Sequence, residues 1–222
     1  MREILIRQLG QRDYLNVLDA MRAFTASRDE HTADELWSVE HPAVFTQGLN
    51  GKPEHLLDPG DIPVIQTDRG GQITYHGLGQ VVIYCLIDVR RAALGVRELV
   101  TRLEQSVIQL LADYGVSSYA EAHAPGVYVN GSKVASLGLR IKRGCTYHGL
   151  SLNVAMDLEP FTRINPCGFP GLTVTQLRDL GVHDDLVSVS TALLGKLAAQ
   201  LGYNRLQITQ SNFDLYQEIA HV

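Results

Sequence analysis

One of the three cysteines stands where a thiol could act as a chemical reagent. Cys167 lies in the segment Asn165 to Gly171, which contains two prolines and two glycines. Proline fixes the backbone φ angle, and glycine permits unusual φ angles or close approach of a ligand. A thiol held in such a loop could attack a carbonyl carbon and carry an acyl group as a thioester. The alternative interpretation is an inert loop thiol.

The other two cysteines have plainer interpretations. Cys85 lies within the apolar run Val81 to Ile87, so we expect it to fill the core, and Cys145 follows a predicted turn and is expected to be incidental. Three cysteines without a paired framework predict reduced thiols and therefore a cytoplasmic protein.

Lys133 is the second candidate for chemistry. It follows Asn130-Gly131, a dipeptide that favours a two-residue hairpin turn, so Tyr128 should face Lys133 across the hairpin. Alternation along the strand then places Lys133 on one apolar face with Ala135, Leu137, Leu139 and Ile141. An unpaired buried lysine has a lowered pKa and can exchange protons near neutral pH. The alternative is an exposed lysine after a turn.

A second turn at Arg143-Gly144 predicts the pairing of the next two strands. It brings Ser136 opposite Ser151, Leu137 opposite Leu150 and Gly138 opposite Gly149. The face opposite Lys133 then carries a strip of four small residues, against which a ligand could lie: Ser136, Gly138, Gly149 and Ser151. One β-bulge would exchange the two faces.

The third candidate is the glycine-containing segment from Arg69 to Gly77. It could be a turn between two strands, or a cradle for a ligand with Tyr75 and His76 at its mouth. A phosphate-binding P-loop is not predicted, because no Gly-Lys-Ser/Thr ending follows. The histidines match no zinc spacing, so we expect neither a metal nor another cofactor. His148 and Cys167 could instead form a hydrolase-like pair.

Periodicity predicts the elements that must position these residues. The predicted fold class is α+β, with a mostly antiparallel or mixed β-sheet flanked by helices. We expect helices at 11–28, 96–114 and around 187–201, a loop at 49–61, and strands at 2–8, 36–39, 43–46, 63–67 and 80–89, followed by two hairpins at 126–154.

The composition limits the classes of protein to which the chain could belong. The 222 residues are 45% hydrophobic and 19% charged, with a formal net charge of −5, and no linker is visible. We therefore expect a single catalytic domain spanning 1–222, without general nucleic-acid affinity. Charged residues interrupt the N-terminus, and the longest apolar stretch is too short to cross a bilayer, so no membrane association is expected.

Five segments in this order resemble the lipoyl(octanoyl) transferase family over nearly the whole chain. They are His41 to Gly48, Arg69 to His76, Gly131 to Gly138, His148 to Asn153, and Asn165 to Gly168. The resemblance implies a fold like the catalytic domain of biotin and lipoate protein ligases. It also implies transfer of an octanoyl group from acyl carrier protein to a lysine of lipoyl domains, those of 2-oxoacid dehydrogenase E2 subunits and of the glycine cleavage H protein.

The resemblance also implies roles for particular residues. Cys167 would carry the acyl group and Lys133 would be its acid/base partner. The acyl-substrate site would comprise Arg69, Gly70, Gly71, Gln72, Ile73, Thr74, Tyr75, His76, Ser136, Leu137, Gly138, Gly149, Leu150 and Ser151. Backbone N–H groups near Leu137 and Gly138 are candidate oxyanion donors. For docking of an acidic carrier protein we expect the basic residues Arg140, Lys142, Arg143, Arg90 and Arg91.

Three rival functions remain open at this stage. An ATP-dependent lipoate or biotin ligase would need a nucleotide site but no nucleophilic thiol. A non-catalytic acyl-binding module would form no covalent adduct. A cysteine hydrolase would use His148 and would release free octanoate.

Overall fold

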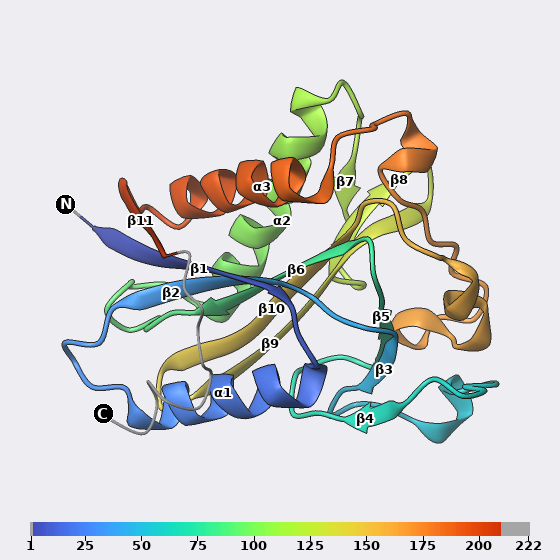
Figure 1. The fold of residues 1–222 in the computed structure, drawn as a ribbon, viewed down its shortest axis with the longest axis horizontal. Coiled ribbons are helices and arrows are strands. Elements are labelled where there is room, and N and C mark those ends of the chain that lie inside the picture. The colour runs from blue at the N-terminus through green and yellow to red at the C-terminus, as the bar shows by residue number, and fades with distance from the viewer. Residues whose placement is uncertain (1, 210–222) are drawn as a thin grey trace.

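The computed structural model describes residues 2–209 of the chain. An eight-stranded sheet lies at the centre of the fold. The strand order is β11-β1-β2-β6-β10-β9-β8-β7 (Figure 1). β1 pairs in parallel with β2 and β11, and the other neighbours are antiparallel. The mixed, mostly antiparallel sheet confirms the predicted fold class. Its strands are β1 (Glu3–Gln11), β2 (Asp34–Glu40), β6 (Gln80–Leu86), β7 (Tyr119–Ala120), β8 (Gly126–Val129), β9 (Ser132–Lys142), β10 (Cys145–Asn153) and β11 (Arg205–Thr209).

Helix α1 (Tyr14–Ser27) connects the parallel strands β1 and β2 and covers one face of the sheet (Figure 1). Asp13 caps its first turn, because its carboxylate accepts hydrogen bonds from the backbone N–H groups of Leu15 and Asn16. Its predicted apolar stripe is buried against residues of β2 and β6, including Trp37 and Tyr84.

Helices α2 (Val96–Asp113) and α3 (Leu186–Gln200) cover the opposite face (Figure 1). Most of the leucines and valines predicted as stripes on both helices are buried there in the largest apolar cluster, whereas Val96 and Val187, at the first turns of the two helices, are exposed. Gly115 follows α2 with a φ of +74°, a left-handed conformation that ends the helix at low cost.

A second, three-stranded sheet carries part of the predicted ligand cradle. Its order is β4 (Val64–Gln66), β3 (Val44–Gln47) and β5 (Ile73–His76). Residues 63–67 and 80–89 were expected to be strands joined across a glycine turn. The structure instead inserts β5 between them, and their strands belong to different sheets. Four short 3₁₀ turns complete the part of the chain that the structure describes: η1 (Pro53–His55), η2 (Glu159–Arg163), η3 (Pro166–Gly168) and η4 (Arg178–Leu180).

Both predicted hairpins form with the predicted register. Asn130 and Gly131 have φ angles of 50° and 83°, as a type I′ turn requires, and Tyr128 pairs with Lys133. Gly138 pairs with Gly149 across the next hairpin, whose turn residues Arg143 and Gly144 also have positive φ. The flanking pairs Ser136–Ser151 and Leu137–Leu150 form as expected.

The face predicted for Lys133 is wrong, because β9 contains a bulge. Tyr128 pairs with Lys133, but Val127 pairs with Ala135, so Val134 is an extra residue on β9. Gly126, two residues before Tyr128, pairs with Ser136. Directly paired residues share a face, so Lys133 lies on the same face as Ser136 and not on that of Ala135. The bulge thus brings the lysine to the strip of small residues.

Within residues 2–209, no helix is long and apolar enough to cross a membrane.

Candidate active site

Cys167 lies in the middle of the 3₁₀ turn η3 in a left-handed backbone conformation. Its φ is 56°, and Gly168 follows with a φ of 80°. The turn is closed by Gly168 N–H donating to the carbonyl of Asn165 at 2.9 Å and Phe169 N–H donating to that of Pro166 at 3.1 Å. A left-handed cysteine costs on the order of 1 kcal/mol, and such strain occurs preferentially at functional sites. Its side chain is half-buried.

Lys133 reaches the thiol of Cys167 from β9. Its Nζ lies 3.0 Å from Cys167 Sγ and donates a 2.9 Å hydrogen bond to the carbonyl of Pro125. Nζ also lies 5.2 Å from the centre of the Tyr128 ring, within cation–π range. Lys133 is only 2% exposed. Sequence reasoning could not establish whether the two candidates touch, and the structure brings them into contact.

The pKa of Lys133 departs from the sequence-based expectation. Burial lowers it, as predicted for a buried lysine. The negative charge of the Cys167 thiolate and the hydrogen bond to it raise the pKa by more, with a smaller contribution from Tyr128, so the net shift is upward. The expectation failed because it treated Lys133 as unpaired. The raised pKa therefore favours the ammonium form of Lys133.

A cavity of about 380 Å³ adjoins Cys167. It lies between the segment beginning at Arg69, the middle of β9 and β10, and the Ala124-Pro125 turn. Every predicted substrate-site residue except Tyr75 lines it, namely Arg69, Gly70, Gly71, Gln72, Ile73, Thr74, His76, Ser136, Leu137, Gly138, Gly149, Leu150 and Ser151. Segments far apart in the sequence thus form one site.

Tyr75 does not lie at the mouth of this cavity. Its ring packs against Phe45 and Phe161, with ring centres 5.5 and 5.4 Å away, in a separate apolar cluster. Successive side chains of β5 point to opposite faces, so Thr74 and His76 point toward the cavity. Ile73 and Tyr75 point into the apolar cluster, and Ile73 only borders the cavity. His76 is itself buried inside the cavity wall, and its Nδ1 lies 2.7 Å from Gln80 Oε1.

The strip of small residues makes room for Arg69 and for the backbone. A Cβ atom at Gly138 would lie 3.1 Å from Arg69 Cδ, and one at Gly149 would lie 2.1 Å from the carbonyl oxygen of Ile83. Glycine at these positions therefore permits close packing in the wall of the cavity.

Arg69 places a buried positive charge in that wall. Its guanidinium donates hydrogen bonds to the carbonyls of Thr46 at 2.6 Å and Gly70 at 3.0 Å, and to Thr46 Oγ1. Burial lowers its pKa, although the residue stays charged at any working pH. Within residues 2–209 its Nε has no hydrogen-bond partner and no carboxylate forms an ion pair with it. A cation so placed favours negative charge in the cavity.

The loop that carries Arg69 is fixed to the open edge of β9. Gly70 N–H donates to the carbonyl of Leu139 at 2.9 Å, beyond the point where β8 ends. Backbone groups alternate between the two edges of a strand, so those of Leu137 point to the same open edge and those of Gly138 point toward β10. Of the two predicted oxyanion donors, Leu137 N–H is the one directed toward the cavity side.

The hydrolase-like pair of Cys167 and His148 does not form. His148 Nε2 lies 3.0 Å from the carboxylate of Asp68, which also accepts a 2.5 Å hydrogen bond from Tyr147. The hydrogen bond to His148 is the main reason that the pKa of Asp68 is lowered, while burial lowers the pKa of His148. The thiol is paired with Lys133 instead.

Sequence reasoning missed an aromatic part of the cavity wall. Tyr14 and Tyr84 line the cavity, and behind them the buried His41 places Nε2 2.7 Å from the Tyr84 hydroxyl. Tyr14 was identified only as a helix-stripe residue, and Tyr84 only as part of an apolar strand. Pro125, which binds Lys133, carried a weak signal as part of a Pro-Gly dipeptide before a strand.

The sequence of the chain is similar to a known protein family and to known enzymes. The family described as the lipoyl protein ligase A/B catalytic domain matches residues 13–198. An octanoyltransferase of Pseudomonas putida (strain W619) is 63% identical over 197 residues, which is 89% of this chain and 92% of the relative. An octanoyltransferase of Marinobacter nauticus is 53% identical over 210 residues, covering 95% and 99% of the two chains.

Solved structures of ligases share the fold at low sequence identity. A putative lipoate protein ligase from Thermoplasma acidophilum with bound lipoic acid superposes with a TM-score of 0.77 at 15% identity, over 99% of this chain and 93% of that one. A lipoate-protein ligase A bound with ATP gives a TM-score of 0.79, also at 15% identity, over 99% and 93% of the two chains. At this identity the likeness concerns the fold alone. The family match and the relatives at 53–63% identity show that the chain belongs to the lipoyl protein ligase A/B catalytic domain family, within its octanoyltransferase branch.

Proposed function

We propose that this chain transfers an octanoyl group from the thioester of an acyl carrier protein to a lysine side chain of a lipoyl domain. Its relatives at 53–63% identity bear the name octanoyltransferase. The observation that carries the proposed mechanism is the 3.0 Å contact between Lys133 Nζ and Cys167 Sγ beside a partly apolar cavity. We propose Cys167 as the acyl carrier and Lys133 as its acid and base.

In the first half-reaction the Cys167 thiolate attacks the carbonyl carbon of the donor thioester. The bond from that carbon to the carrier sulfur breaks, and the departing sulfur takes a proton from Lys133 Nζ. A tetrahedral oxyanion forms on the way, and Leu137 N–H is our candidate donor to it. The products are the free carrier thiol, an octanoyl thioester on Cys167 and a neutral Lys133.

Acylation changes the proton affinity of Lys133 in the direction that the second half-reaction needs. The thiolate charge that raises the pKa of Lys133 disappears when Sγ is acylated, whereas burial, which lowers the pKa, persists. The pKa of Lys133 is therefore lower in the acyl-enzyme than in the resting pair, which makes it a better proton acceptor there.

In the second half-reaction the acceptor amine attacks the Cys167 thioester. The amine nitrogen gives a proton to Lys133, the bond from carbon to Cys167 Sγ breaks, and an amide forms. The ammonium–thiolate pair is thereby restored. A free lysine amine is neutral in only about 1 of 2,500 molecules at pH 7, so the acceptor ammonium first loses one proton to solvent, and Lys133 accepts the second proton as the amide forms.

The partners are proposed from the same evidence. The donor is the octanoyl thioester of acyl carrier protein, and the acceptors are lipoyl domains of 2-oxoacid dehydrogenase E2 subunits and of the glycine cleavage H protein. A domain with these partners would work in the cytoplasm.

Intact mass spectrometry tests the proposal. After mixing with octanoyl-acyl carrier protein, the wild-type chain should gain the mass of one octanoyl group and lose it when a lipoyl domain is added. The Cys167→Ser variant should form no octanoyl adduct that can be transferred to the lipoyl domain. A chain without Cys167 that transfers octanoyl at the wild-type rate would refute the mechanism, and formation of octanoyl adenylate from ATP and octanoate would favour a ligase.

A further inference from the structure

A single peptide unit links Lys133 to a buried carboxylate on helix α2. The carbonyl of Pro125 accepts the 2.9 Å hydrogen bond from Lys133 Nζ. The N–H of Gly126, the other half of the same planar peptide, donates to Glu104 Oε1 at 3.1 Å. The two groups of a trans peptide point in opposite directions, so Glu104 and Lys133 hold this unit from its two sides.

Glu104 is an unusual residue for its position. It is 7% exposed on the side of α2 that buries Leu103 and Val107 in the core. In the described part of the chain, Gly126 is its one hydrogen-bond partner and it forms no ion pair. Burial raises the pKa of Glu104, opposed by the Gly126 hydrogen bond and by the charge of Lys133. A buried carboxylate without an ion pair is costly, which points to a role beyond packing.

Gly126 shows how closely Lys133 depends on this peptide. Its φ is +146°, and a Cβ atom there would lie 2.4 Å from Lys133 Cε and 3.0 Å from Nζ. The lysine side chain therefore lies directly against the peptide that Glu104 holds. A movement of this peptide would displace both the packing surface and the hydrogen-bond acceptor of the lysine.

We propose that Glu104 is a positioning residue for acyl transfer, which acts on Lys133 through the Pro125–Gly126 peptide. This inference rests on the proposed function of Lys133. Glu104 fixes the carbonyl that binds Nζ, and it adds a negative charge behind that carbonyl. The titratable groups that face Lys133 are Cys167 from η3, Tyr128 from β8 and Glu104 from α2. In the acyl-enzyme the thiolate is gone, and of these three groups the Glu104 carboxylate is the one that can still place a negative charge near Lys133.

The test is the pH dependence of the second half-reaction. Wild type, Glu104→Gln and Glu104→Ala are first acylated with a small octanoyl thioester, freed of excess donor and then mixed with a lipoyl domain. Glutamine keeps an oxygen that accepts from Gly126 but removes the charge, so the pKa of Lys133 in the acyl-enzyme falls. The midpoint of the rate profile should move to lower pH by about half a unit, and transfer at the acidic end should be about 3-fold faster than in wild type. A purely structural role would only slow the reaction.

Alanine removes the acceptor as well, and its maximal rate should fall at least ~10-fold because Lys133 loses its fixed position. Glu98→Gln, on the exposed first turn of the same helix, is the matched control and should leave the profile unchanged. Superimposable profiles of Glu104→Gln and wild type would overturn the inference, whether or not the alanine variant folds. A wild-type chain that never gains an octanoyl group would instead refute the proposed function.

Discussion

At the scale of single residues, the contact between Lys133 and Cys167 is the basis of the proposed roles of the two side chains. In the proposed mechanism, the raised pKa of Lys133 in the resting pair suits it to donate a proton to the leaving thiol, and the loss of the thiolate on acylation suits it to accept one. A group with one fixed proton affinity would serve only one of the two steps.

Replacing Lys133 with alanine should therefore slow both half-reactions. General acid or base assistance is worth about 10² to 10⁴ in rate, so we expect losses of at least about 100-fold in acylation and in deacylation. Rapid-quench mass spectrometry times the two steps separately. Slowing of cysteine acylation alone would contradict the proton-transfer role.

The buried histidines His41 and His76 predict loss of stability in acid. Burial lowers their pKa values from 6.5 to about 4 and about 3. Between these values and 6.5 the unfolded chain binds more protons than the folded chain, so stability is full above pH 6.5 and falls as pH decreases. At pH 5 each histidine should cost on the order of 2 kcal/mol.

Urea unfolding at pH 7 and at pH 5 measures this effect. His41→Gln should reduce the difference between the two free energies of unfolding, whereas the exposed His31→Gln should leave it unchanged. Equal pH dependence in wild type and His41→Gln would show that the loss arises elsewhere.

The sequence indicates the chemistry of Cys167 and of Lys133, but it does not show that the two side chains are in contact. Cys167 and Lys133 are 34 positions apart, and they are brought together by a loop and a strand whose packing no local pattern encodes. The position of Pro125 could not be inferred either, because its role depends on the direction of one carbonyl group.

At the scale of secondary structure elements, the hairpin registers were predictable and the bulge was not. Asn130-Gly131 and Arg143-Gly144 determine which residues face each other, since a two-residue turn leaves one choice. Val134 looks like any strand residue, and only packing in three dimensions makes it the extra one. Because the bulge at Val134 has no signal in the sequence, the prediction places Lys133 on the wrong face of the strand.

Gly126 on β8 is expected to be intolerant of a side chain. Gly126→Ala would place Cβ 2.4 Å from Lys133 Cε and should reduce cysteine acylation at least about 10-fold. Gly131→Ala is the matched control, because Gly131 also has positive φ but has open space around its Cβ position. Both should lose about 1 kcal/mol of stability from backbone strain. Gly126→Ala should lose more than that, because its Cβ would also lie 2.6 Å from the carbonyl oxygen of Ala135, and it alone should lose activity. Equal activities of the two variants would contradict this account.

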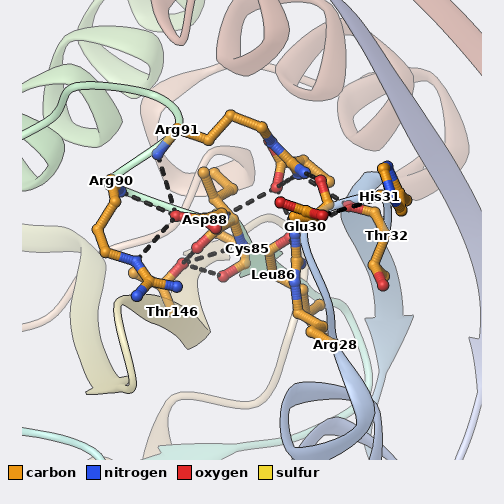
Figure 2. Close-up of polar contacts among 12 residues, drawn as sticks. Arg28, Glu30, His31, Thr32, Cys85, Leu86, Asp88, Arg90, Arg91 and Thr146 are labelled. Carbon is orange, nitrogen blue, oxygen red and sulfur yellow. Dashed lines mark hydrogen bonds and ion pairs between the residues drawn. The ribbon is translucent and has the colours of Figure 1, made fainter.

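Asp34 at the start of β2 joins several elements into one buried network. Its carboxylate accepts hydrogen bonds from Arg28 at 2.5 Å, Arg91 at 2.7 Å, the backbone of Asp88 at 2.8 Å and the hydroxyl of Tyr203 at 2.6 Å. Figure 2 shows part of this region, with Arg91 extending toward the loop that carries Glu30 and Thr32. The network ties the ends of β2 and β6 to the segments around α1, α2 and α3.

Asp34→Asn should destabilise the fold by about 3 kcal/mol, because the buried Arg28 and the partly exposed Arg91 lose their counter-charge. Thermal unfolding should show a melting temperature lower by roughly 6–12 °C. Asp113→Asn removes an exposed ion pair with Lys196 and should change stability by less than about 1 kcal/mol. None of the Asp34 partners lines the cavity, so a large loss of activity in folded Asp34→Asn would be unexpected.

At the scale of the whole molecule, a chain of net charge −5 would need a local basic surface to bind the acidic carrier protein that we propose as its donor. Arg140, Lys142, Arg143 and Arg90 are exposed around the β9–β10 turn, where the Arg90 side chain lies beside Gly144. Arg91, which was expected to join them, turns instead to the buried Asp34. The proposed docking patch is therefore Arg90, Arg140, Lys142 and Arg143.

Charge reversal tests this patch. Arg140→Glu with Lys142→Glu should lower kcat/KM for octanoyl-acyl carrier protein about 10-fold or more and weaken its dependence on salt. A small octanoyl thioester should be used at the wild-type rate. Arg178→Glu with Lys196→Glu makes the same change in net charge outside the patch and should have little effect. Equal losses in the two double variants would argue for a general charge effect.

The two halves of the reactive pair are anchored with unequal strength. Lys133 belongs to a long strand in the central sheet, whereas the turn around Cys167 is tied down by a few contacts, such as Asn165 N–H to the carbonyl of His55 and the bridge between Leu56 and Ile164. Short irregular segments open locally at a smaller free-energy cost than the sheet unfolds. Gentle heating should therefore abolish the enzymatic activity at a temperature below that at which the sheet unfolds. Cooling should restore the activity, because the sheet has not unfolded.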